Sequence, residues 1–235
     1  MQAGIMQPYF FPYIGYWQLL NVVDEYIVFD DVNYIKRGWI NRNNILLNGQ
    51  RKLINLHIKD ASQNRLIKDT QIAQTEKDNR NLLATITQCY RYAPYYEDVY
   101  ALIERILNDK STCVSDYLVN QLKEICTYLH IRTRIILSSS IETDNALKGE
   151  EKIIDICKKR KADKYINAIG GKSLYHQEKF RERGIELKFL RTREIQYKQF
   201  GEAYIPNLSI IDVMMFNDVD RIKEMLCEFD VEEGM

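Results

Sequence analysis

The chain has 235 residues, and its 33 Lys plus Arg balance its 33 Asp plus Glu, so the formal net charge is zero. This balance argues against a nucleic-acid binder and against a binder of anionic membranes, because both classes need net positive charge. The length suits one large α/β domain or two small ones, and no apolar run is long enough to span a bilayer.

The first forty residues combine aromatic side chains, two prolines and an Asp-Asp pair. The segment MQAGIMQPYFFP has no basic start and its apolar stretch is broken by prolines, so we expect a cytoplasmic protein without a signal peptide. A short strand ends at Met6, and Pro8 and Pro12 then force extended or turn geometry. Residues 13–23 permit a helix, and residues 26–29 form a β-branched and aromatic strand that stops at Asp30 and Asp31.

The middle of the chain is predicted to be mostly helical. Asn48-Gly49 is a tight-turn signal that pairs residues 45–47 with a strand over residues 51–58. After a polar loop over residues 60–76, apolar residues at helical spacing predict helices over residues 79–92, 96–107 and 115–129. We interpret the segment from about 77 to 130 as a helical insertion.

Strands and helices alternate again from residue 132 onward. Strands are expected over residues 132–140, 163–169 and 185–190, and helices over residues 148–160, 174–183, 208–217 and 219–229. This alternation predicts an α/β fold with a largely parallel, doubly wound, Rossmann-like sheet and a helical insertion, all in a single domain over residues 1–235.

Ligands of open α/β sheets bind at the carboxyl ends of the strands, where two groups of candidate residues fall. The first is the loop that carries Gln7, Pro8, Tyr9 and Tyr13. The second is the pair Asp30 and Asp31, of which one carboxylate is a candidate catalytic base and the other a solvated strand end. We add His176 as a candidate catalytic residue, since it follows a glycine turn.

The segment IKRGWINRN joins three cations, a tryptophan and two asparagines. Arginine forks match phosphate oxygens, and tryptophan stacks on rings. Because residues 41–44 are poor material for a helix or a strand, we favour a ligand-binding loop over a solvated turn. Its candidate substrate-binding residues are Lys36, Trp39, Asn41, Arg42 and Asn43.

In the segment AIGGKSLY, an expected strand enters two glycines and a helix start. Free N–H groups at a helix start attract phosphate or carboxylate, so this turn is a candidate anion site. The alternative is a plain glycine turn in which Ser173 caps the helix. The candidate binding residues here are Gly170, Gly171, Lys172 and Ser173.

The five cysteines are odd in number and form no CxxC pair, and the three histidines lie far apart in the sequence. We therefore predict neither a disulfide framework nor a zinc site. No cofactor can be assigned, although Asp30 and Asp31 have the chemistry to hold a Mg²⁺ ion bridged to a substrate diphosphate.

Four long motifs, IMQPYFFPYIGYWQLL, FDDVNYIKRGWINRN, YINAIGGKSLY and LSIIDVMMFN, resemble those of the WbqC-like family. The resemblance covers the chain almost from end to end. It implies a bacterial cytosolic protein encoded among genes for O-antigen, lipopolysaccharide or other surface glycans. The implied activity is a transferase that works on a nucleotide-linked sugar, with acyl or aminoacyl transfer to an amino sugar as the reaction.

Two alternatives stay open. A strand, proline loop, glycine-aromatic pair and helix also begin the HxGH nucleotidylyltransferases, so the first alternative is a nucleotidylyltransferase or ligase that uses ATP or CTP. Tyr13-Ile14-Gly15-Tyr16 stands where the two histidines of that family would lie. The second alternative is a non-catalytic scaffold in a glycan-assembly complex.

Overall fold

The computed structural model describes residues 1–144 and 146–234. One sheet is built from β1 (Gln2–Met6), β2 (Glu25–Val28), β5 (Arg134–Leu137), β6 (Lys164–Ala168), β7 (Glu186–Thr192) and β8 (Phe229–Glu233). The strands lie in the order β5-β2-β1-β6-β7-β8, and all pairs are parallel except β7 with β8. The α/β fold with a largely parallel, Rossmann-like sheet is confirmed.

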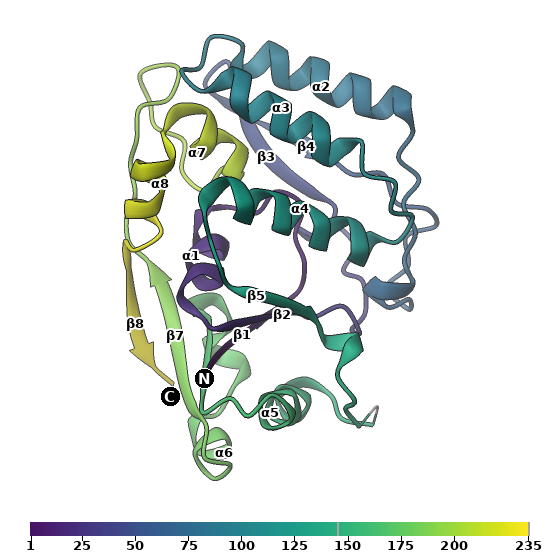
Figure 1. Cartoon of the computed structure of the whole chain (residues 1–235), viewed down its shortest axis with the longest axis vertical. Helices are drawn as coiled ribbons and strands as arrows, with labels where there is room; N and C mark the ends of the chain where they lie inside the picture. The colour runs from purple at the N-terminus through teal and green to yellow at the C-terminus, as the bar shows by residue number, and fades with distance from the viewer. Residues whose placement is uncertain (145, 235) are drawn as a thin grey trace.

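Helices cover both faces of this sheet (Figure 1). They are α1 (Ile14–Val22), α5 (Gly149–Lys159), α6 (Gln177–Arg181), α7 (Ile210–Phe216) and α8 (Val219–Met225). Buried side chains of α5 and α6 form one hydrophobic cluster with inward residues of β1, β6 and β7. A second, larger cluster joins the other face of the sheet to α1, α7 and α8. Two cores on opposite faces are what the doubly wound arrangement requires.

The segment between β2 and β5 contains a hairpin and three helices. The hairpin pairs β3 (Arg42–Leu47) with β4 (Gln50–Asn55), and α2 (Glu76–Tyr90), α3 (Tyr96–Leu107) and α4 (Val114–Leu129) follow. Both turn residues have positive φ, 51° at Asn48 and 72° at Gly49, which explains the Asn-Gly pair. The predicted helices are confirmed, and their buried faces belong to the same cluster as α1. A single domain with a helical insertion stays a prediction.

The Asn-rich segment was predicted wrongly to avoid strand structure, because β3 begins at Arg42. Asn43 is buried and its side-chain amide donates to the carbonyl oxygens of Phe10 and Phe11. These tertiary hydrogen bonds outweigh the low strand propensity of asparagine.

Two predicted helices are shorter than expected. A 3₁₀ turn, η3 (Ile169–Leu174), contains the Gly170-Gly171 pair, and α6 begins only at Gln177, so Ser173 does not cap a helix. At the end of the chain α8 stops at Met225 and β8 takes its place, antiparallel to β7. Cross-strand ion pairs such as Arg191–Glu232 join β8 to β7, and such partners are invisible to local periodicity.

The strand order has a switch point at β1. The strand β1 connects to β2 on one side of it, whereas β6, on the other side of β1, connects onward to β7. The two connections therefore run in opposite directions across the sheet. The loop after β1 and the Gly170-Gly171 turn therefore share the carboxyl edge of the sheet, where a crevice is expected.

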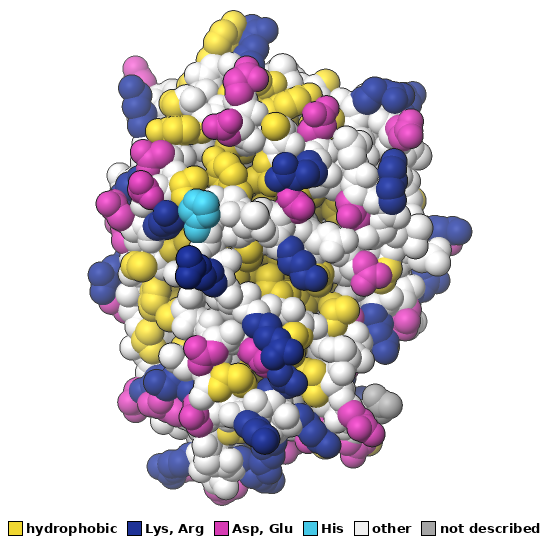
Figure 2. Space-filling model, viewed as in Figure 1, with side chains coloured by type: hydrophobic (Ala, Val, Ile, Leu, Met, Phe, Trp, Pro, Cys, Tyr) yellow, Lys and Arg dark blue, Asp and Glu magenta, His cyan; other side chains and the backbone are white. Residues whose placement is uncertain are grey.

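Charge is evenly spread over the face seen in Figure 2, where basic and acidic side chains alternate with small apolar areas between them. That face carries no continuous field of one sign, in keeping with the zero net charge. Within residues 1–144 and 146–234, no helix has both the length and the apolar character needed to cross a membrane.

Candidate functional site

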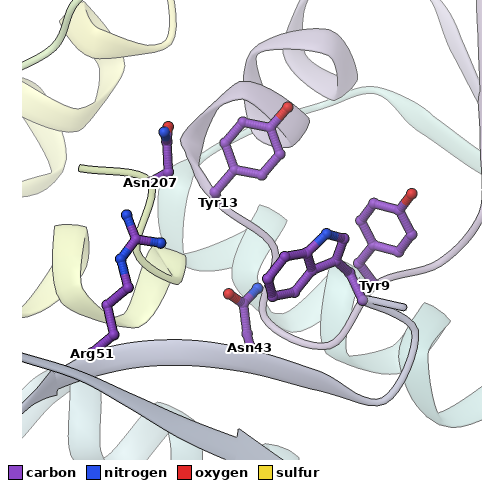
Figure 3. A pocket seen from close by; sticks show the side chains of 6 residues that line it. Tyr9, Tyr13, Asn43, Arg51 and Asn207 are labelled. Atoms are coloured by element: carbon purple, nitrogen blue, oxygen red, sulfur yellow. The ribbon is translucent and has the colours of Figure 1, made fainter. Parts of the chain in front are cut away.

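A cavity of about 400 Å³ opens beside the loop that follows β1 (Figure 3). Tyr9 and Tyr13 reach it from this loop, Asn43 and Arg51 from the two strands of the hairpin, and Asn207 from the segment before α7. Trp39 completes the lining. Three aromatic rings, one guanidinium and two amides thus converge from parts of the sequence up to almost two hundred residues apart.

The loop after β1 is fixed by hydrogen bonds from three directions. Phe11 has a φ of 43°, which is costly for a residue with a Cβ. Its N–H donates to Gln121 of α4, and its carbonyl oxygen accepts from Asn43 and from the hydroxyl of Ser209, at 2.8 Å in each case. Strained backbone persists where its surroundings determine it this fully, so the tyrosines of this loop are held in place before any ligand arrives.

Arg51 is the cation of the cavity. Its guanidinium donates one hydrogen bond to the carbonyl oxygen of Pro206, at 2.7 Å, and otherwise faces the open space. Trp39 keeps 45% of its surface exposed, although its own carbonyl oxygen accepts from the N–H of Phe10. An exposed ring and a guanidinium that line the same cavity provide a stacking surface and an anion contact together.

Burial raises the pKa of Tyr9 and of Tyr13 above the ordinary tyrosine value. Both phenols therefore stay protonated near neutral pH and act as hydrogen-bond donors or acceptors rather than as bases. Among the described residues, no carboxylate or histidine lines this cavity. The cavity is equipped to bind and orient a ligand.

Gly15 permits the close contact that shapes one wall. A Cβ at this position would lie 2.5 Å from Oγ1 of Thr192, at the end of β7, and 2.6 Å from the ring of Tyr13. The absence of a Cβ at Gly15 therefore lets the Tyr13 ring pack against the start of α1.

We expect Gly15→Ala to displace Tyr13 and to lower the free energy of unfolding by about 1–3 kcal/mol, although alanine favours helices. Urea unfolding measures the change. Gly170→Ala is the matched control, because a Cβ at Gly170 meets nothing within 4 Å. Equal stability of both variants would contradict the steric argument.

The structure places Asp30 away from the cavity, in a buried polar cluster. Asp30 is 1% exposed, and its carboxylate accepts from the hydroxyl of Ser115 and from the N–H and hydroxyl of Ser139. Ser138 bridges it to Asp31. Asp31 also forms an ion pair with Lys152, at 2.5 Å, so these contacts join the segments that follow β2 and β5 to α4 and α5. Their catalytic roles stay a prediction.

The segment of residues 35–43 divides between structural bonds and exposed groups. The side chain of Arg42 donates to the carbonyl oxygens of Gly38 and Arg37 and so closes its own loop. Asn41 accepts from the hydroxyl of Tyr34 and donates to the carbonyl oxygen of Leu56. Lys36 is exposed, whereas Trp39 and Asn43 line the cavity.

The Gly170-Gly171 turn lies on the expected edge of the sheet but not in the cavity lining. Lys172 forms an ion pair with Glu232 of β8 at 3.0 Å, and Ser173 is exposed. His176 is exposed and its N–H donates to Glu150 of α5. Asp30, Arg42 and this turn do not line the cavity beside the loop after β1, and their roles in ligand binding stay a prediction.

Gln7 and Pro8 lie in the loop after β1 but do not line the cavity. The carbonyl oxygen of Gln7 accepts from the buried hydroxyl of Tyr16, at 3.2 Å, and Pro8 is buried. Sequence analysis missed two lining residues, Arg51 and Asn207. The sequence offers two signals for them. The turn at Asn48-Gly49 sets the register of the strand that carries Arg51, and the Pro206-Asn207 pair precedes α7.

No group of three or more His, Cys, Asp or Glu side chains in residues 1–144 and 146–234 is arranged to hold a metal ion. The cysteines Cys89, Cys113, Cys126, Cys157 and Cys227 are all free thiols. Burial raises the pKa of Cys126 and of Cys157 to about 12, so neither is a ready nucleophile.

The chain belongs to the WbqC-like protein family, whose model matches residues 7–224. It is also similar to the uncharacterized protein Rv1507c of Mycobacterium tuberculosis (strain ATCC 25618 / H37Rv). The two are 27% identical over 219 residues, which is 92% of this chain and 93% of the relative. No solved structure matches the chain significantly.

Proposed function

We propose that the chain is a transferase that binds a nucleotide-linked sugar in the aromatic cavity and modifies that sugar, with acyl or aminoacyl transfer to an amino sugar as the reaction. The observation that carries the proposal is the convergence of Tyr9, Tyr13 and Trp39 with Arg51 at the carboxyl end of β1. Membership of the WbqC-like family, with its implied place in surface-glycan synthesis, supports the same substrate class.

Each part of a nucleotide sugar has a counterpart in the lining. A base or sugar ring stacks on the exposed face of Trp39 or on a tyrosine ring. The diphosphate oxygens accept hydrogen bonds from the guanidinium of Arg51. They lie near the start of α1, where backbone N–H groups and the helix dipole favour negative charge. Asn207 and the tyrosine hydroxyls are available to sugar hydroxyls.

The lining supports catalysis by orientation. The amine nitrogen of the sugar forms a bond to the acyl carbon, the bond from that carbon to the donor's leaving group breaks, and the departing group takes up the proton. Because the tyrosines stay neutral, they hold the amine and the acyl oxygen by hydrogen bonds. Positioning alone contributes strongly to such two-substrate reactions.

The strand order favours one further candidate, a nucleotidylyltransferase or ligase that uses ATP or CTP. The order β5-β2-β1-β6-β7, with α1 starting directly after the β1 loop, is that of many nucleotide-binding folds. Tyr13 and Tyr16 stand where the phosphate-stabilising histidines of the HxGH enzymes would be, which weakens this candidate.

Calorimetric titration with UDP-, dTDP- and GDP-linked amino sugars, ATP, CTP and CoA thioesters separates the candidates. The proposal requires saturable binding of a sugar nucleotide. Binding of ATP or CTP alone would favour the nucleotidylyltransferase or ligase. Binding of none of these compounds would favour the non-catalytic scaffold.

We expect Arg51→Ala to weaken binding of the sugar nucleotide about ten- to a hundred-fold, because a charge-assisted contact contributes about 1.5–3 kcal/mol. Arg51→Lys should recover only part of the loss, since an ammonium lacks the bidentate fork. Lys52→Ala is the matched control, because Lys52 is the next residue of β4 and lines a different depression. Equal affinity of the Arg51 and Lys52 variants would remove Arg51 from the site.

A further inference from the structure

One edge of the β3–β4 hairpin is open. The N–H of Leu46 donates to Tyr90, and the carbonyl oxygen of Asn44 accepts from Ser209, so both residues direct their backbone groups away from β4. Bonded and non-bonded pairs alternate in an antiparallel ladder. The partners of these two residues, Arg51 and Leu53, therefore point their own N–H and C=O outward, and so does Asn55.

The chain itself covers only the end of this edge. The carbonyl oxygen of His57 accepts from Ala73, and the N–H of Lys59 donates to the carbonyl oxygen of Gln71. Residues 71–73 thus occupy the position of a third strand, and after Gln74 the chain turns away into α2. Beside Arg51, Leu53 and Asn55 the third-strand position is empty, because the outward groups of these three have no hydrogen-bond partner among the described residues.

A groove runs along the open edge. Its volume is about 290 Å³, and it lies between β4 and the first turns of α2, which contribute Asp78 and Asn81. Leu53 is 42% exposed at its rim. A strand edge beside a helix is a geometry that accepts an extended peptide, with backbone bonds for affinity and side-chain contacts for selectivity.

The charges of the groove select the occupant. Asp78 is already bonded to Thr75 in a capping box and lies 3.4 Å from the ring of His57. Lys52 lines the same groove and has no ion-pair partner in residues 1–144 and 146–234. A carboxylate of an incoming ligand would give Lys52 an ion-pair partner.

We propose that the open edge of β4 binds an extended acidic peptide segment of a partner protein by strand addition. Ligand residues that face Arg51, Leu53 and Asn55 exchange backbone hydrogen bonds with them. Side chains of neighbouring ligand residues point to opposite faces, so one apolar side chain lies over Leu53 while the next, a carboxylate, reaches Lys52. This binding site is separate from the aromatic cavity, although Arg51 contributes its backbone to one and its side chain to the other.

Selection of random heptapeptides displayed on phage, followed by amide exchange measured by NMR, tests the proposal. Selected peptides should pair an apolar with an acidic residue. The amides of Arg51, Leu53 and Asn55 should exchange fast in the free protein and become protected, at least ten-fold, with the synthetic peptide bound, whereas those of Lys52 and Ile54 should be slow throughout.

Leu53→Pro removes one outward N–H but no bond of the hairpin, so it should abolish binding, whereas Leu53→Thr should keep it. If the proline variant fails to fold, alternate N-methylation of the peptide makes the same test on the intact protein. Failure to select any peptide, or protection outside β4, would overturn the proposal. Protection that rises with protein concentration alone would mean that a second copy of the chain pairs there instead, which also overturns it.

Discussion

Replacing Asp30 with alanine should lower the free energy of unfolding by about 3 kcal/mol, the range found when one member of a buried polar network is removed. The carboxylate is 1% exposed, and its loss leaves the hydroxyls of Ser115 and Ser139 and the N–H of Ser139 without their acceptor. Urea unfolding followed by far-UV circular dichroism measures the change.

Asp220→Ala is the control, because that carboxylate is 91% exposed on α8 and its removal should change stability by no more than about 0.5 kcal/mol. The experiment also decides the role first assigned to Asp30. A structural carboxylate loses stability on substitution, whereas a catalytic one loses activity at nearly unchanged stability. The second pattern would return Asp30 to the active site and require that the serine cluster open during turnover.

The sequence predicted the elements of the sheet well because periodicity and turn residues report local structure. The strand of residues 26–29, the Asn-Gly hairpin and the helix over Tyr96–Leu107 all follow from patterns within a few residues. Where local patterns conflicted with distant partners, the prediction failed. The strand β8 pairs with β7 and is joined to it by ion pairs such as Arg191–Glu232. The strand β3 is held by the hydrogen bonds from Asn43 to the Phe10 and Phe11 carbonyl oxygens.

The candidate site shows the same division. Tyr9, Tyr13, Trp39 and Asn43 were singled out by their place after a strand or by side chains that suit a ligand, and the structure brings all four together. Asp30 and Arg42 were chosen by the same criterion, yet their polar groups are used by neighbours inside the protein. Residue type and strand-end position cannot distinguish a polar group that faces a ligand from one that ties two elements together.

The motif LSIIDVMMFN contains a polar residue, Asp212, that connects several elements by hydrogen bonds. Asp212 is fully buried in α7, and its carboxylate accepts from the hydroxyls of Tyr90 and Tyr197 and from the amide of Gln199. Tyr90 in turn accepts from the N–H of Leu46 in β3. One carboxylate therefore connects α2, α7, the hairpin and the segment that leads to Asn207.

Burial raises the pKa of Asp212 above the ordinary value, although its three donors oppose this shift. The folded state consequently holds the proton more tightly than the unfolded chain, in which an aspartate titrates near pH 3.9. The stabilisation from this proton is complete below about pH 3.9. It is lost as the pH rises through the higher pKa of the folded state.

Asp212→Asn removes that titration and keeps the shape of the side chain. Other carboxyl groups titrate in the same range, so the informative quantity is the difference in free energy of unfolding between the wild type and the variant. We expect the wild type to lose stability relative to Asp212→Asn as the pH rises from about 3.9 through the higher pKa of the folded state. Chemical denaturation at several pH values measures this difference.

Glu232 supplies a control of opposite sign. Hydrogen bonds from Arg191 and Lys172 lower its pKa to about 2, so its contribution to stability is present above the ordinary glutamate pKa and is lost as the pH falls towards 2. The difference between the wild type and Glu232→Gln should therefore change with pH in the opposite direction. A wild type that gains stability over Asp212→Asn as the pH rises would show that the tyrosine and glutamine donors, rather than burial, dominate the energetics of Asp212.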